Sequence, residues 1–371
     1  MEIYINDRIR TRKVSFFESF RLNLKYDALA SSFTFRYFFD PNNLEHKEFS
    51  CLGHYHVVTL KHNGETLLTG QILSTAFNHS SVKELSAIGG YSLPGILEDC
   101  EITSPTPASS VPFFLSPAQL TPIVSPYQFD GMTLKEICTQ LIKPFGLSMV
   151  IDPIVSSRMN DKFEESNARA SQNIRSFISE LTAQKNIIVS HNEKGQLLFT
   201  QISPTAKPIA TFDGSAPVTS MSLSFNGQVM HSHIRVISQA DPDDVNANEN
   251  EVRNPYVINS VYRPRVMVQN SRSTTLDVNQ SAKNIRAQEL KGIPLIIKLD
   301  RWDLNGKIIR PGQLISAINP NIYLYKKSNW VIEEVELEGD ATKQTATLHC
   351  VLPETFNGQD PSYLWAGINL H

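Results

Sequence analysis

The chain has 371 residues, and its 34 lysines and arginines against 37 aspartates and glutamates give a formal net charge of −3. This length exceeds one ordinary core and suits roughly two to four domains. The charge argues against a dedicated nucleic-acid-binding protein, although a local basic face remains possible. Because the sequence has no apolar run of membrane-spanning length and no signal-peptide core at its start, we expect cytosolic synthesis and no stable membrane insertion.

Residues 1–100 predict an all-β domain, because short strands alternate with turn residues. Asn6-Asp7 and Asn63-Gly64 are the predicted hairpin turns, and Phe33–Phe39 is the most aromatic strand. A strand over 82–88 is expected to end at Gly89-Gly90, and a short helix follows over 93–100. Short, evenly spaced strands favour a barrel or roll.

Residues 101–126 predict an extended arm, because proline cannot donate to a strand ladder. Six prolines lie there among serines and threonines: Pro105, Pro107, Pro112, Pro117, Pro122 and Pro126. A free linker is the simpler interpretation, but the apolar run from Val111 to Leu115 argues against it and is expected to pack on another surface.

Residues 127–205 predict a two-layer α+β module. Thr133 and Glu136 form a capping-box pattern at the start of a first helix, and Pro144 to Gly146 ends it. Ser171 is the expected N-cap of a second helix. A hairpin turning at 192–195 follows. Nothing in this module is obviously catalytic.

Residues 206–371 predict a second β-rich domain with one helix over 274–291 and Gly292 as its stop. The acidic, asparagine-rich stretch 240–254 predicts a mobile loop. The expected fold class is therefore α+β, mainly β, with two barrel-like or roll-like domains on either side of the module.

Two histidine pairs are the candidate metal ligands. His54 and His56, and likewise His231 and His233, are two residues apart, so on a strand each pair would share a face. Zinc needs further ligands, and no HExxH motif supplies them, so solvated or interface histidines are the simpler interpretation. Asp241, Asp243 and Asp244 resemble a calcium loop but lack its glycine.

The other polar clusters give no positive indication of catalysis. The sequence has no GxSxG, Walker or GxGxxG motif in the required context, and the carboxylate pairs Glu164-Glu165 and Glu333-Glu334 lie in polar surroundings. The four cysteines are scattered without a CxxC pair, which indicates buried thiols: Cys51, Cys100, Cys138 and Cys350. We therefore expect no catalytic residue, no cofactor and no metal site.

The basic N-terminal residues have two interpretations. They are either the solvated faces of strands or a surface for an acidic partner or DNA: Arg8, Arg10, Arg12, Lys13, Arg21 and Lys25.

The order of these elements resembles the baseplate hub protein of Mu-like contractile phage tails, also called the late-control or tail protein. More distantly, it is similar to the hub part of type VI secretion spike proteins. The resemblance covers most of the chain and depends on four short segments: Ala87 to Gly90 leading to Leu97 to Cys100, Thr133 to Ile137 leading to Pro144 to Leu147, Asn192 to Phe199, and Tyr262 to Pro264.

The resemblance implies a structural homotrimer in the baseplate of a phage or prophage virion. Its ring would adapt the tail tube to a separate trimeric spike, contact other baseplate proteins, and surround a channel through which DNA passes transiently during ejection. We expect exposed aromatics of Phe33–Phe39 and the arm at 111–115 to lie at chain contacts. The alternatives are a tail-associated cell-wall hydrolase and a receptor-binding or carbohydrate-binding β protein using Trp302, Trp330 and Trp365.

Overall fold

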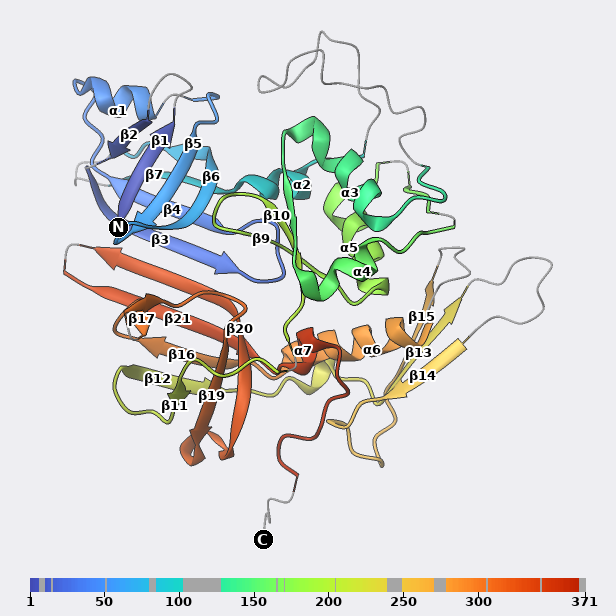
Figure 1. The fold of residues 1–371 in the computed structure, drawn as a ribbon. Helices are drawn as coiled ribbons and strands as arrows, with labels where there is room; N and C mark the ends of the chain where they lie inside the picture. The colour runs from blue at the N-terminus through green and yellow to red at the C-terminus, as the bar shows by residue number, and fades with distance from the viewer. Residues whose placement is uncertain are drawn as a thin grey trace.

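A computed structural model of the chain (Figure 1) places a large β-sheet on one side and most of the helices on the other. It describes residues 1–6, 11–14, 16–50, 52–79, 85–102, 128–164, 166–169, 171–203, 205–238, 249–269, 278–304, 306–340 and 342–366. The calcium-like loop, most of the arm with its 111–115 run, and Cys51, Arg8 and Arg10 lie outside these ranges.

The N-terminal part is built from seven described strands and one short helix. They are β1 (Glu2–Asn6), β2 (Thr11–Val14), β3 (Phe17–Lys25), β4 (Ser32–Tyr37), α1 (Leu44–Phe49), β5 (Val57–His62), β6 (Glu65–Ala76) and β7 (Ser86–Ser92). β5 pairs with β6 on either side of Asn63-Gly64, which confirms that expected hairpin. β1 pairs antiparallel with β2, but Asp7 of the turn expected at Asn6-Asp7 lies outside the described residues.

The C-terminal part supplies the other strands of the same sheet. They are β11 (Thr211–Phe212), β12 (Val218–Leu223), β16 (Leu295–Leu299), β19 (Leu314–Asn319), β20 (Leu324–Asp340) and β21 (Gln344–Val351). The short hairpin of β17 (Asp303–Leu304) and β18 (Lys307–Ile308) lies beside it. Glu338 to Asp340, expected as a turn, instead extend β20, and the reversal follows Asp340.

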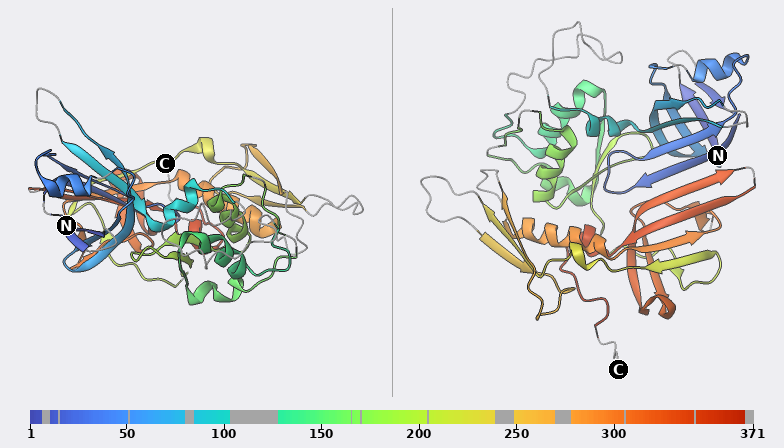
Figure 2. Two further views of the ribbon diagram at one scale, coloured as in Figure 1. Left: turned by 90° about the horizontal axis from the view of Figure 1, so that it is seen from above. Right: turned by 180° about the vertical axis from the view of Figure 1, so that it is seen from behind.

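One sheet joins the two β parts, where two separate barrel-like domains were expected. Its strand order is β12-β16-β21-β20-β3-β4-β7-β6-β5-β1-β2, with β11 and β19 beside this path. Antiparallel pairing of β3 with β20 forms the seam, where Leu22 lies opposite Leu337. The strands described here leave the sheet open, and buried residues from both parts form one continuous core. Figure 2 shows the two parts side by side.

Three aromatic residues of β4 face the interior, so they cannot provide the chain contacts expected of Phe33–Phe39, whereas Phe38 and Phe39 are partly exposed. Phe33, Phe35 and Tyr37 are at most 2% exposed, because alternate residues of a strand point to one face. The next strand, β7, does not end at Gly89-Gly90 but continues to Ser92. A side chain at Gly90 would overlap the carbonyl oxygen of Gln71. These glycines permit close strand packing.

The helical module confirms the capping box and corrects the second N-cap. Glu136 accepts the Thr133 backbone N–H at 2.8 Å, and the Glu136 N–H donates to the Thr133 hydroxyl at 3.2 Å. The second helix is capped by Asn173, because Ser171 has a positive φ of 59°. The main elements are α2 (Ile96–Asp99), α3 (Leu134–Ile142), β8 (Met149–Ile151), α4 (Ser156–Met159), α5 (Ile174–Gln184), β9 (Ile188–His191) and β10 (Leu197–Thr200).

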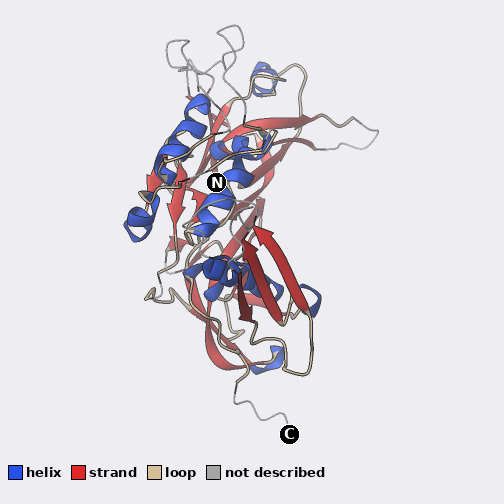
Figure 3. Cartoon of the chain, turned by 90° about the vertical axis from the view of Figure 1, so that its right-hand side faces the viewer, coloured by secondary structure: helices blue, strands red, loops and turns tan. Residues whose placement is uncertain are grey.

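A smaller α+β unit lies below the module (Figure 1). It contains β13 (His233–Ser238), β14 (Glu249–Arg253), β15 (Pro264–Gln269) and α6 (Val278–Glu289). Its sheet order is β14-β13-β15. Within the expected loop 240–254, Glu249 to Arg253 form a strand instead, and residues 240–248 lie outside the described ranges. Helix α7 (Glu354–Asn357) lies beside α6, and Figure 3 shows the helices from the side opposite the large sheet.

Short 3₁₀ turns complete the connections. They are η1 (Leu93–Gly95), η4 (Lys143–Phe145), η5 (Pro153–Val155), η6 (Gly227–Val229), η7 (Leu290–Gly292) and η8 (Pro320–Ile322). No helix of the described chain is long and apolar enough to cross a membrane.

Candidate functional site

The two histidines of the 231–233 pair contact different residues. His231 Nδ1 lies 2.6 Å from Glu289 Oε1, and the His231 backbone N–H donates to Glu289 Oε2 at 2.9 Å. His233 instead contacts the hydroxyl of Ser232 at 2.8 Å and the ring of Tyr262. The pair therefore does not present two imidazoles to one ion.

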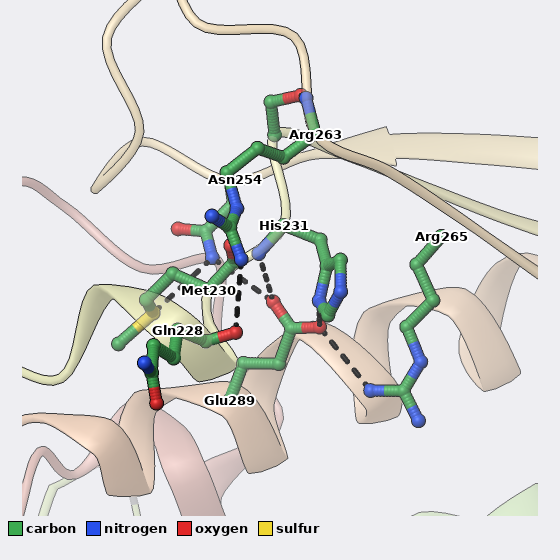
Figure 4. Close-up of polar contacts among 8 residues, drawn as sticks. Gln228, Met230, His231, Asn254, Arg263, Arg265 and Glu289 are labelled. Atoms are coloured by element: carbon green, nitrogen blue, oxygen red, sulfur yellow. Dashed lines mark hydrogen bonds and ion pairs between the residues drawn. The ribbon is translucent and has the colours of Figure 1, made fainter.

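Glu289, at the end of α6, organises the polar cluster in Figure 4. Its side chain is 3% exposed, and it also accepts hydrogen bonds from Asn254 and from Arg265, both at 3.3 Å. These partners come from β15 and from the segments flanking β13 and β14. The carboxylate therefore fastens the small sheet to α6, and packing accounts for its position.

The other histidine pair has different surroundings. The rings of His54 and His56 lie 5.5 Å apart in the segment before β5, which is not a strand, and Tyr55 between them has a φ of 49°. Within the described residues, neither pair belongs to a group of three potential metal ligands. The group found there is a different one, formed by Glu334, Glu336 and His349 on the large sheet.

A partly buried ion network joins three parts of the chain. Lys291 of η7 contacts Asp27, which follows β3, and lies 2.6 Å from Glu333 of β20. Burial lowers the pKa of Lys291, but the two carboxylates outweigh it and raise that pKa above 10.5. Burial raises the pKa of Glu333 above 4.5, and Lys291 only partly offsets this. Sequence inspection noted Glu333 but could not indicate these partners.

Most of the described basic N-terminal residues are paired within the chain. Arg12 contacts Glu48, Lys13 contacts Glu2 at 2.5 Å, and Arg21 contacts Glu338. Lys25 lies 3.9 Å from Glu334. These contacts favour the interpretation of a solvated sheet face over a surface for an acidic partner.

The tryptophans differ in their burial. Trp302 and Trp330 are at most 2% exposed and belong to the main core, so they cannot stack on a sugar ring. Trp365 lies within 6.2 Å, between ring centroids, of four aromatic residues: Phe225, Tyr256, Tyr323 and Tyr363. Trp365 is partly buried and packs against the main core, so its neighbours already occupy much of its ring.

A cavity of about 1060 Å³ separates α5 from α6 and β15. Its walls include Glu180 and Arg169, which pair with each other at 3.9 Å, as well as Glu289. Glu289 is held by donors of its own chain, as described above. Asp27 also lines the cavity and contacts Lys291, so the three carboxylates named on the described walls each lie near a basic side chain of the same chain.

Two apolar surface patches lie in distant parts of the fold. The name N-terminal patch denotes the exposed apolar residues in and after α1 and just after β6: Leu44, Leu52, Tyr55 and Phe77. The β15 patch lies at an edge strand and consists of Ile258, Tyr262, Val266 and Val268. Exposure reaches 68% at Leu52 and 76% at Tyr262. Large apolar side chains exposed to this degree are candidate residues for protein contacts.

Comparison with known families finds a match to most of the helical module. Residues 121–201 match the family described as baseplate hub protein gp44-like, second domain. The resemblance drawn from the sequence is thereby confirmed, and the match supports relationship to hub and tail proteins of phage or prophage type. The comparison with curated proteins finds no match.

Solved structures match the chain over nearly its whole length. A 43 kDa tail protein of prophage MuSo2 from Shewanella oneidensis has a TM-score of 0.75 at 16% identity, covering 96% of this chain and 99% of that one. The tail protein from Neisseria meningitidis MC58 has a TM-score of 0.71 at 15% identity, covering 94% and 96%.

A more distant match comes from Escherichia coli. The c3393 protein, a component of the type VI secretion system with structural similarity to T4 bacteriophage tail proteins gp27 and gp5, has a TM-score of 0.53. It is 10% identical, and the match covers 98% of this chain and 80% of that one. At these identities the likeness establishes a shared fold.

Proposed function

We propose that the protein is a structural, non-enzymatic hub subunit in the baseplate of a contractile phage or prophage tail. Three copies form a ring that adapts the tail tube to a separate spike and surrounds the channel for DNA. The protein is made in the host cytoplasm and ends in the virion. The main support for this proposal is the whole-chain fold shared with prophage tail proteins, together with the match of residues 121–201 to the hub-domain family.

The large sheet supports this assignment. Each chain contributes two β parts joined at the β3–β20 seam, so three chains would bring six such parts together around one axis. A hub that matches a hexameric tube to a trimeric spike needs this doubling. Continuous pairing and a shared core would keep the two parts fixed relative to each other.

The two apolar patches support a ring closed by head-to-tail contacts. Such an interface joins two different surfaces of identical chains and generates a ring when the rotation closes. The N-terminal patch and the β15 patch are different surfaces on opposite sides of the view in Figure 1. We infer that the N-terminal patch of one chain contacts the β15 patch of the next.

Native mass measurement tests the assembly. We expect the purified protein at micromolar concentration to have three times the mass of the 41.7 kDa chain. A protein that remains monomeric would contradict the hub assignment. A cell-wall zymogram tests the enzyme alternative separately, and we expect no zone of clearing.

A further inference from the structure

Three potential metal ligands converge on the face of the large sheet opposite its main core. Glu334 and Glu336 are two residues apart on β20, so their side chains share a face. His349 of β21 lies directly opposite Glu334 in the antiparallel pairing. The two carboxylates and the imidazole each offer an atom within 4.8 Å of the other two.

An unsatisfied nitrogen distinguishes this group from an ordinary polar sheet face. His349 Nε2 is buried and has no hydrogen-bond partner in the described structure. Buried side-chain nitrogens normally have one, so an unpaired nitrogen calls for an explanation. A bound metal ion would accept the lone pair of this atom or fix the tautomer in which the other ring nitrogen binds.

A β-bulge sets the direction of the two glutamates. The β20–β21 register shifts between Ile332 and Glu334, which leaves Glu333 as the extra residue. Glu333 reaches Lys291 in the ion network, whereas Glu334 joins Glu336 and His349. Bulges re-aim side chains and are over-represented beside functional sites. The bulge therefore directs Glu333 into the ion network and Glu334 towards the proposed metal site.

We propose that Glu334, Glu336 and His349 bind a divalent first-row transition metal, with Zn²⁺ as the first candidate. Zinc accepts carboxylate oxygen and imidazole nitrogen at about 2.0–2.2 Å, so its ligands lie at most about 4.4 Å apart. Separations of up to 4.8 Å need only small side-chain rotations to reach this geometry. Water completes the coordination shell, since the three groups are partly exposed.

Neighbouring residues of β3 act on this site in opposite ways. Asn23 donates to Glu334 Oε1 at 2.7 Å, which orients the carboxylate as an outer-shell partner does. Lys25 Nζ lies 3.9 Å from Glu334 Oε2, and its positive charge opposes a second cation. The Lys25 side chain is 40% exposed, so it can swing into solvent when metal binds. Removal of Lys25 should therefore tighten metal binding.

The location indicates what the metal would do. The ligands lie on β20 and β21, and β20 also forms the seam with β3. A metal would fasten β20 to β21 beside that seam and stabilise the folded chain by binding it selectively. This proposal does not depend on the hub assignment, since it concerns a site within one chain.

Equilibrium dialysis of the full-length protein against Zn²⁺, with metal analysis, tests the site. We expect one zinc per wild-type chain and binding at least about tenfold weaker in Glu336→Gln and His349→Gln. Glu338→Gln is the matched control, because Glu338 lies on the same strand and face but pairs with Arg21 and is outside the group. It should bind as wild type, and Lys25→Met should bind more tightly.

The Glu336 side chain is partly exposed, so Glu336→Gln should fold even if His349→Gln does not, and it can then test the site alone. A wild-type protein that binds no Zn²⁺ would overturn the proposal. So would retention of wild-type affinity by folded Glu336→Gln, which would place any bound zinc elsewhere, for example at His54 and His56. A zinc-dependent rise in Tm, present in wild type and absent in Glu336→Gln, gives an independent readout.

Discussion

Gly90 packs closely against the neighbouring strand, so even its replacement by alanine should destabilise the folded chain. A Cβ at this position would overlap the Gln71 carbonyl oxygen and lie 2.8 Å from the Phe33 ring. We expect Gly90→Ala to lower the free energy of unfolding by about 3 kcal/mol, measured by denaturant titration. The control is Gly227→Ala, whose Cβ would meet only Phe225, at an ordinary 3.4 Å. Equal losses in both variants would contradict the packing explanation.

The Lys291 network should give a pH-dependent stability. Lys291→Met leaves the carboxylates of Asp27 and Glu333 close together without their cation, so we expect a loss of about 3 kcal/mol near neutral pH. Because the pKa of folded Glu333 is raised above 4.5, Glu333 takes up a proton at a higher pH in the folded chain than in the unfolded chain. The deficit should therefore shrink as pH falls through that window.

For the wild type, the raised pKa of Lys291 means that its contribution is fully present below 10.5 and is lost at higher pH, through the folded pKa. Denaturant unfolding at several pH values measures both trends. Lys307→Met, at an exposed position, is the control and should show neither. A Lys291→Met deficit that is constant from neutral to acidic pH would exclude Glu333 as its source.

At the scale of elements, the seam between β3 and β20 couples the two β parts. Leu337 is fully buried opposite Leu22, and we expect Leu337→Ala to cost about 2–5 kcal/mol. Both parts should unfold together, because they share one core. Tryptophan fluorescence reports the C-terminal part, and amide exchange in β5 and β6 reports the N-terminal part. Lys298→Ala, exposed on β16, is the control.

Separate transitions for the two parts in wild type would show that the seam does not couple them. Coincident transitions that shift together in Leu337→Ala would support one cooperative sheet.

Elements that depend on residues close in sequence were predictable from the sequence, whereas elements that depend on pairing with distant strands were harder to predict. The capping box of α3 needs only Thr133 and Glu136, three residues apart, so sequence indicated it correctly. Asn173 replaced Ser171 as a cap because the backbone at Ser171 turns to positive φ. The strand Glu249–Arg253 is polar and forms by pairing with β13, which composition could not indicate.

At the scale of the whole molecule, paired variants test how the proposed ring closes. Leu52→Glu with Tyr55→Glu alters the N-terminal patch, and Val266→Glu with Val268→Glu alters the β15 patch. In a head-to-tail ring each double variant alone should be monomeric. Their mixture should form heterodimers, because one intact copy of each patch remains. Native mass spectrometry distinguishes these species.

Lys207→Glu, at an exposed loop position, is the control and should assemble as wild type. An isologous interface predicts a different pattern, in which only one double variant loses assembly and the mixture forms no heterodimer. That result would exclude the proposed pairing of patches. The native mass of wild type tests the trimer independently.

The sequence by itself determined the mainly β fold class, the module with its capped helix, and the resemblance to baseplate hub proteins, because these depend on short-range periodicity and on the order of elements. The tertiary structure decided that the two β parts share one sheet, that the aromatic face of β4 is buried, and that Glu334, Glu336 and His349 converge. These features arise from pairing between strands distant in sequence, such as β3 with β20, or from a bulge whose register depends on its partner strand.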